Sequence, residues 1–410
     1  MWIRTVLAAG FLILIGCTGR NRNNPLDPRN SETGGVVQGA EAVSEQDHVF
    51  LSWNALRSDY PVEYRIYRKQ AGADDYIQIG TAHSTAFHDS GLAMGETVQY
   101  RVSAVTDAGF ESPLSEAAAV TPGPHAYWVA DYYGQKIVRL TYDAVHVLDE
   151  IDGYFMPVNV VVDFDSDRIW AANWRDGELL KITEGDLIQR LGGFVQPRLL
   201  AFDANQRMIW VVHDSLREII RLDSQGHIID KLKGFDRIVS ISWAGMDSGC
   251  WVVDADMKIV NLIDPEGNWT LQQSFENPTA VDACLKDDWA WVSDDSQLLQ
   301  LRKDGQLRSV HSFNEGQIVA LSTDESTGGC WLAARTDGES AYHVQKVDSL
   351  GSLLCSQSGF GQIYDILADP FDGGCLVADF LWGEVVRISA EGEIISRFQA
   401  FASPAGLSIG

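Results

Sequence analysis

A recurring set of polar residues offers the first candidates for chemistry. Each follows a short apolar run, and the runs recur at a spacing of about 40 residues. The set comprises Asp131, Asn173, His213, Asp254, Asp294 and Asp379, and the equivalent position of the sixth repeat holds Ala334. A calcium ion needs six to eight converging oxygen atoms, whereas equivalent positions of successive repeats diverge. An Asp at a strand end ordinarily accepts hydrogen bonds from the backbone amides of a turn. We therefore predict that these residues stabilise turns, with no metal ion and no other cofactor.

Two further patterns bear on catalysis. The nine histidines include no HExxH motif and no other close ligand pair. The string from Gly406 to Gly410 matches G-x-S-x-G, but a nucleophile elbow needs a helix after Ser408, and none follows in this sequence. We interpret the match as chance and predict that the protein is not an enzyme.

Aromatic residues form a third candidate group. They lie in loops next to the first, second and seventh apolar runs: Tyr132, Tyr133, Tyr154, Phe155, Trp174, Phe380 and Trp382. If the repeats close into a ring, these loops share one sector of one face. Exposed rings there would suit stacking on a sugar or capture of a loop from a partner protein. The alternative is local core over the sheet edges, because Tyr133 and Trp382 each precede a glycine in a shared turn pattern.

The elements that must position these residues are short strands in an internal repeat. An apolar anchor, usually Trp, begins each repeat: Trp128, Trp170, Trp210, Trp251, Trp291, Trp331 and Leu376. A second apolar run follows, then a turn that usually contains Gly, a third run ending near an aromatic residue, and a fourth run that often opens with Pro. Four short strands per repeat of about 40 residues are typical of β-propeller blades.

Residues 404–410 supply the strand that the first repeat lacks before its anchor. We predict an all-β fold in which this C-terminal strand completes the first of seven blades and closes the ring, leaving no long unpaired edge. The Val-Ala-Asp step, the second run ending in Arg-Ile or Arg-Leu, and the following Gly resemble NHL-type propeller repeats. The resemblance covers residues 124–410 and implies a seven-bladed β-propeller, a fold that hosts enzymes, scaffolds and receptors.

In such a ring, polar residues near the starts of the innermost strands would form the mouth of a central channel. They are Asn159, Arg198, Arg237, Thr279, Gln317, Gln362 and Asp365. The resemblance implies that propeller lyases and lactonases use His, Glu, Asp or Asn around this channel. Here the mouth holds two Arg but neither His nor Glu, so no acid–base pair or metal triad is recognisable.

Residues 36–122 show a different pattern, with alternating apolar residues, frequent turn residues and no run of helical period. Trp53, the run from Tyr64 to Arg68 and the stretch from Gly95 to Val102 resemble a fibronectin type III domain. That resemblance implies a β-sandwich in which Tyr100 is the corner tyrosine, its hydroxyl bonded to nearby backbone. We interpret this domain as a spacer, with an independent binding role as the alternative.

The N-terminus is predicted to direct export. A basic start and an apolar run too short to cross a bilayer are typical of a signal peptide. Leu14 to Cys17 resembles the lipobox of bacterial lipoproteins, which implies that residues 1–17 are a lipoprotein signal and that Cys17 is acylated. Thr18, in place of Asp, implies the outer membrane where the host has one. Residues 18–35 are predicted to be a flexible tether.

Five further cysteines lie in the repeat region: Cys250, Cys284, Cys330, Cys355 and Cys375. Equivalent strands of neighbouring blades are too far apart for a disulfide. We interpret these residues as buried thiols, and one disulfide remains an open alternative.

The net charge and the predicted lipid anchor together restrict the classes of function that we expect. The 410 residues contain 57 Asp and Glu against 31 Lys and Arg, a formal net charge of -26. That balance excludes a nucleic-acid partner and favours a neutral or basic one. We expect a non-catalytic, lipid-anchored protein of the outer membrane or cell surface, whose propeller binds a protein or glycan. The alternatives are a lyase- or lactonase-type enzyme acting on a small exported substrate, and a structural subunit of an envelope complex.

Overall fold

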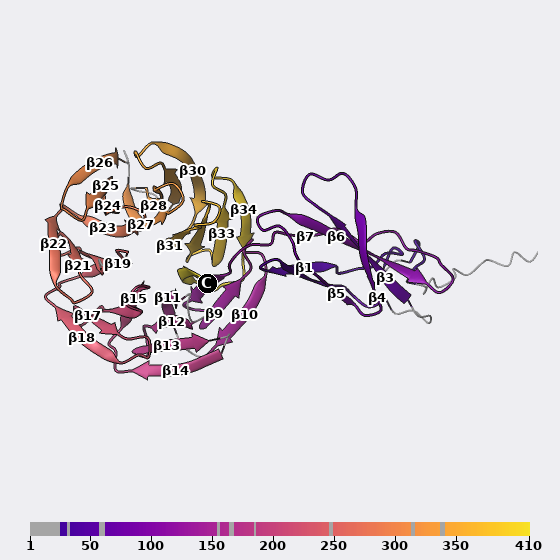
Figure 1. The fold of residues 1–410 in the computed structure, drawn as a ribbon, viewed down its shortest axis with the longest axis horizontal. Coiled ribbons are helices and arrows are strands. Elements are labelled where there is room, and N and C mark those ends of the chain that lie inside the picture. Colours follow the sequence, from indigo (N-terminus) through magenta and orange to yellow (C-terminus); the bar gives the residue numbers. More distant parts are fainter. Residues whose placement is uncertain are drawn as a thin grey trace, which may run out of the picture. The chain divides into compact units, whose positions relative to one another are not determined.

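The computed structural model describes residues 25–30, 33–56, 62–153, 156–163, 168–183, 186–245, 249–312, 316–336 and 341–410 (Figure 1). Within these ranges every regular element is a β-strand, which agrees with the predicted all-β class. The chain divides into two compact units, one with most residues up to 119 and the other with residues 120–410 and two short earlier segments, 43–49 and 90–96. The predicted signal peptide, Cys17, Tyr154 and Phe155 lie outside the described residues.

Residues 41–120 form two antiparallel sheets, with strand orders β1-β2-β5 and β4-β3-β6-β7. The strands are β1 (Glu41–Glu45), β2 (His48–Ser52), β3 (Val62–Lys69), β4 (Ile77–Ala82), β5 (Ala86–Asp89), β6 (Val98–Thr106) and β7 (Ala118–Val120). Alternation along β6 buries Tyr100 and Val102. The Tyr100 hydroxyl donates to the carboxylate of Asp89 at 2.7 Å. This corrects the expected bond to backbone, because the half-buried carboxylate of Asp89 stands within reach.

The described part of the predicted tether differs from a flexible chain. The hydroxyl of Thr33 donates to the carbonyl oxygen of Pro25 at 2.6 Å, and the amide of Gly34 donates to the carbonyl oxygen of Asn30 at 2.9 Å. Leu26 is buried. Local hydrogen bonds and one apolar side chain therefore hold this part in turns, although its composition is that of a linker.

The second unit contains, in the described residues, seven four-stranded antiparallel sheets. The innermost strands are β35 (Pro404–Ile409), β11 (Pro157–Asp163), β15 (Pro197–Asp203), β19 (Ile238–Trp243), β23 (Pro278–Cys284), β27 (Gln317–Asp324) and β31 (Ile363–Ala368). The second strands are β8 (Tyr127–Asp131), β12 (Arg168–Asn173), β16 (Met208–His213), β20 (Cys250–Asp254), β24 (Trp289–Asp294), β28 (Gly329–Arg335) and β32 (Cys375–Asp379). The third strands are β9 (Lys136–Leu140), β13 (Glu178–Thr183), β17 (Glu218–Leu222), β21 (Ile259–Ile263), β25 (Gln297–Arg302), β29 (Tyr342–Val347) and β33 (Glu384–Ile388). The outermost strands are β10 (Val147–Asp152), β14 (Asp186–Gly192), β18 (Ile228–Lys233), β22 (Trp269–Ser274), β26 (Leu307–Ser312), β30 (Leu353–Phe360) and β34 (Ile394–Phe398).

The C-terminal strand joins the first sheet of this unit. β35 pairs with β8 in antiparallel register from Pro404 opposite Asp131 to Ile409 opposite Tyr127. Each innermost strand contacts the innermost strand of the next sheet, and the series returns from β31 through β35 to β11. Figure 1 shows the sheets arranged around a common centre. The second unit is therefore β-propeller-like.

Every innermost strand carries a β-bulge near its start, where the register against the second strand shifts by one residue. The residues passed over by the pairing are Val158, Arg198, Val239, Thr279, Val319, Tyr364 and Ala405. A bulge interrupts strict alternation and re-aims the side chain that it carries. It therefore decides which residues of an innermost strand face the centre of the ring.

Buried tryptophans pair with cations on the neighbouring strand. Trp170 and Trp210 stand opposite Lys181 and Arg221 in the antiparallel register. Each cationic group lies 5.2 Å from the centroid of its partner ring, a cation–π geometry. The rings are fully buried and the cations nearly so. Much of the tryptophan content of this chain is thus architectural.

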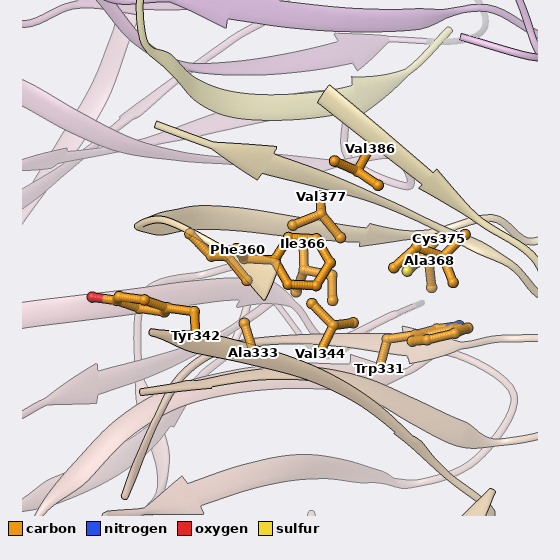
Figure 2. Close-up of a cluster of buried hydrophobic side chains, with 12 residues drawn as sticks. Trp331, Ala333, Tyr342, Val344, Phe360, Ile366, Ala368, Cys375, Val377 and Val386 are labelled. Atoms are coloured by element: carbon orange, nitrogen blue, oxygen red, sulfur yellow. The ribbon is translucent and has the colours of Figure 1, made fainter. Parts of the chain in front are cut away.

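The apolar cores lie between neighbouring sheets. Figure 2 shows the cluster between the sheets of β27–β30 and β31–β34, which includes Trp331, Ala333, Tyr342, Val344, Phe360, Ile366, Ala368, Cys375, Val377 and Val386. Cys375 contributes to this core as a small apolar side chain. All five cysteines of the repeat region are unpaired, which confirms thiols and not a disulfide, although Cys355 is only partly buried.

Candidate functional site

The strand-end polar residues stabilise turns, as predicted. Asp379 accepts hydrogen bonds from the amides of Gly361, Gln362 and Trp382 at 2.6, 3.1 and 3.1 Å. Equivalent loop amides donate to Asp131, Asp254 and Asp294. Each carboxylate ties the loop before an innermost strand to the end of the second strand, which fixes the loops of one face.

His213 departs from this pattern. It is fully buried, neither ring nitrogen has a hydrogen-bond partner, and its Nδ1 is 3.7 Å from Oε1 of Glu218. Burial lowers the pKa of His213, so the neutral ring is favoured. The loop amides at the equivalent position belong to Val195 and Gln196. An imidazole here gives the loop a poorer acceptor than the carboxylate or amide oxygen used in other sheets.

We predict that His213→Asn raises the free energy of unfolding by about 1 kcal/mol near neutral pH, because a buried ring without partners is replaced by an oxygen acceptor. Asn173 shows the arrangement, since its Oδ1 accepts the amide of Met156 at 3.0 Å. The pKa of His213 is lower in the folded than in the unfolded state, so wild-type stability is lost as the pH falls below about 6.5. The advantage of the Asn variant should therefore grow toward acid pH, as measured by urea unfolding at two pH values.

The reciprocal change, Asn173→His, is the matched control, because Asn173 faces Glu178 as His213 faces Glu218. It should lower stability by a similar amount. A His213→Asn protein no more stable than wild type at either pH would contradict this account.

Aromatic side chains from three sheets gather on one face of the second unit. The ring centroid of Tyr132 lies 4.7 Å from Tyr133, 6.5 Å from Trp174 and 6.3 Å from Phe380. Phe380 in turn stacks on Tyr364, with centroids 4.4 Å apart and planes inclined by 23°. We call these five residues the aromatic cluster.

The aromatic cluster has a half-buried base and an exposed surface. Tyr132, Trp174 and Phe380 are half-buried, whereas Tyr133 is 60% and Tyr364 is 53% exposed. Trp382, which lies beside Gly361, is 52% exposed. Some rings of the cluster therefore pack locally, and others expose more than half of their side chains.

A cavity of about 240 Å³ lies among the innermost strands at the centre of the ring. The polar side chains that line it are Asn159, Ser240, Thr279, Asp282, Ser322, Tyr364 and Asp365. Asn159, Thr279 and Asp365 were predicted for the channel mouth. Tyr364 belongs both to the lining and to the aromatic cluster, so the cluster stands at the edge of the cavity.

The other predicted mouth residues do not line this cavity. Arg198 Nε lies 3.3 Å from Asp214, and Arg237 Nε lies 2.7 Å from Asp256. Both arginines are thus engaged by acidic partners outside the cavity. Gln317 and Gln362 are half-buried beside the entering loops.

Two lining carboxylates have unusual electrostatics. Burial raises the pKa of Asp365 to about 7, against the opposing hydrogen bonds from the amides of Leu407 and Ile366 and with a further contribution from Asp282. Burial also raises the pKa of Asp282. Asp282 and Tyr364 were not among the residues predicted from the sequence. A carboxylate within a mostly apolar innermost strand was the signal available for Asp282, and the bulge that carries Tyr364 has no such signal.

The described residues offer no metal centre beside the cavity. They hold no group of three or more His, Cys, Asp and Glu side chains placed to bind a metal ion. They also form no helix with the length and apolar character needed to traverse a membrane. The cavity and the aromatic cluster at its edge therefore make up the candidate site.

Comparison with known proteins supports the fold and leaves the activity open. No protein-family model matches the chain. Among solved structures, a protein from Lactobacillus plantarum is similar with a TM-score of 0.57 and 11% identity, over 70% of this chain and 99% of that chain. A functionally unknown protein from Desulfotomaculum acetoxidans is similar with a TM-score of 0.55 and 14% identity, over 70% of this chain and 99% of that chain. Hydrazine synthase from Kuenenia stuttgartiensis is similar with a TM-score of 0.55 and 11% identity, over 64% of this chain and 91% of that chain. At these identities the similarity concerns the fold alone.

One curated relative shares a short stretch of sequence. An alpha-amylase from Niallia circulans is 38% identical over 94 residues, which are 23% of this chain. The matched stretch spans 7% of the length of the amylase.

Proposed function

We propose that this protein is an exported, lipid-anchored, non-catalytic protein of the bacterial cell envelope whose propeller binds a protein or glycan partner. In this proposal the second unit is a seven-bladed NHL-like propeller, and residues 36–122 are a fibronectin type III-like spacer. Lipidation of Cys17 would hold the chain at the outer membrane or cell surface. The sequence supports export and anchoring through the apolar run before Leu14–Cys17.

The aromatic cluster carries the binding proposal. Tyr133 and Tyr364 expose more than half of their side chains on a base of packed rings. Rigid aromatic side chains contribute large contact areas at low entropic cost, which is why binding hot spots are rich in them. Their position at the edge of a polar cavity combines apolar contact with hydrogen-bonding groups, as in many ligand sites.

The double variant Tyr133→Ala/Tyr364→Ala tests the proposal. We expect the full chain, solubilised in mild detergent, to bind a component of an envelope protein or glycan fraction, and the variant to bind it at least about tenfold more weakly. The matched control is Leu354→Ala/Ile395→Ala, which removes side chains that are 57% and 54% exposed on outermost strands. Unchanged binding by the aromatic variant, or equal losses in both variants, would count against this face as the binding site.

A further inference from the structure

The central cavity contains carboxylates but no cationic side chain among its lining residues. Its titratable lining groups are Asp282, Tyr364 and Asp365. Asp365 accepts hydrogen bonds from the amides of Ile366 and Leu407 at 2.9 and 2.8 Å. Both donors are neutral, so they orient the carboxylate without offsetting its charge.

Asp282 is held in the same way. It accepts the hydroxyl of Ser242 and the amide of Thr323, each at 2.7 Å. A carboxylate has about four acceptor positions, so Asp365, which accepts from two amides, keeps capacity for a further donor. Another buried carboxylate of this unit is paired differently, since Asp324 lies 2.9 Å from the ammonium of Lys346. Within the described ranges, Asp282 and Asp365 thus lack the kind of cationic partner that buried charges ordinarily require.

The volume of the cavity and the aromatic residues at its edge indicate which kind of ligand can supply a cationic partner for Asp282 and Asp365. Pockets that enclose whole small molecules measure about 300–1,000 Å³, so a cavity of about 240 Å³ suits one protruding group. At its edge Tyr364 presents an exposed ring, with Phe380 stacked on it. Aromatic faces attract cations and accommodate alkyl chains.

We propose that the cavity receives the ammonium group of a lysine side chain that projects from a protein partner. The inference rests on the proposed function, because the aromatic cluster that contacts the partner also forms the edge of the cavity. Charge complementarity supports it, since a net charge of -26 favours a basic partner. A lysine side chain is slender and carries its charge at the tip, so it suits a cavity of this size. An amino sugar, by contrast, carries its amine on a ring. A calcium ion needs six to eight oxygen ligands, so two carboxylates favour an ammonium group instead.

The test uses the full chain and the acetylated, amidated peptide Gly-Lys-Gly, with the same peptide containing norleucine in place of lysine as the neutral match. Titration calorimetry at about pH 8 should show saturable binding of the lysine peptide alone. Binding should weaken about tenfold at about pH 5.5, where Asp365, with its pKa of about 7, is protonated. Asp365→Asn and Asp282→Asn should each weaken binding at least about tenfold at the higher pH. Asp256→Asn, at an exposed ion pair, is the control and should leave binding unchanged.

Three results would overturn the proposal: equal binding of the norleucine peptide, tighter binding of glucosamine or calcium ions, or no saturable binding up to about 50 mM. If one variant fails to fold, two comparisons on the wild-type protein still decide the outcome: binding at the two pH values, and binding of the lysine peptide against the norleucine peptide. If Asp282→Asn and Asp365→Asn bind the natural partner normally while Tyr133→Ala/Tyr364→Ala does not, the lysine proposal fails and the proposed function stands. Normal partner binding by all three variants would reject both.

Discussion

Deleting residues 404–410 should abolish the folded second unit, and we expect the truncated chain to be recovered as aggregated protein. The deletion removes β35, the innermost strand of the first sheet, together with the buried side chains of Leu407 and Ile409. Burial of each such side chain contributes about 1.5–3 kcal/mol, and total stabilities are only about 5–15 kcal/mol. The deletion also leaves β8 as an unpaired edge strand, a template for association with other chains.

Solubility and intrinsic tryptophan fluorescence of the truncated chain measure this effect. Adding a synthetic peptide of residues 402–410 should restore native fluorescence in part, because the peptide can occupy the vacant position beside β8. Leu407→Ala should lower stability by about 2–4 kcal/mol, and the half-buried Ser408→Ala by no more than about 0.5 kcal/mol. A truncated chain that unfolds cooperatively at the wild-type midpoint would show that ring closure contributes little.

Arg387→Met should lower the free energy of unfolding by about 3–5 kcal/mol, because it removes one partner of a buried ion-pair network. Arg387 is 1% exposed, and its guanidinium lies 2.9 Å from Asp369 and 2.7 Å from Asp372. Its charge also faces the rings of Tyr127 and Tyr142. Methionine fills a similar volume but leaves the buried carboxylate of Asp369 without its cation.

The pH dependence identifies the cause of that loss. Burial alone would raise the pKa of Asp369, but the His125 hydrogen bond and the Arg387 charge lower it to about 2. A depressed carboxyl pKa contributes stability that is present above about pH 4 and is lost as the pH falls toward 2. The gap between wild type and Arg387→Met in urea unfolding should therefore narrow from about pH 6 to about pH 3. The control Arg237→Met removes an exposed ion pair and should cost less than about 1 kcal/mol. A gap independent of pH would instead point to lost packing.

The repeat and its phase could be predicted because they depend on local hydrophobic pattern. Trp170 and Trp210 recur with the period of one sheet, and residues 404–410 have the composition of the missing strand. The turn-stabilising role of Asp379 could be predicted for the same reason. It depends on the amide of Gly361, which lies in the loop that leads into the same sheet.

The channel lining could be predicted only in part. Asn159 and Asp365 were found from their places near strand starts, but Asp282 and Tyr364 were not. A strand without a bulge would present alternate residues to the channel, and the bulge near each strand start interrupts that alternation. Sequence pattern carries no direct record of where a bulge lies. The contact of Arg198 with Asp214 likewise joins the bulge residue of β15 to the loop after β16, which the hydrophobic period does not encode.

The pairing of β35 with β8 also has a consequence for the order of events in folding. The amide of Ser403 donates to Asp131, a residue 272 positions earlier in the chain. Contacts of such sequence separation form late, because the entropy of closing a long loop is lost before the contact is made. Sheets built from four consecutive strands can form as each segment emerges, but the first sheet waits for the last. During synthesis, β8 therefore remains an open edge for the longest time, and a chaperone that covers residues 127–131 would have the most to protect.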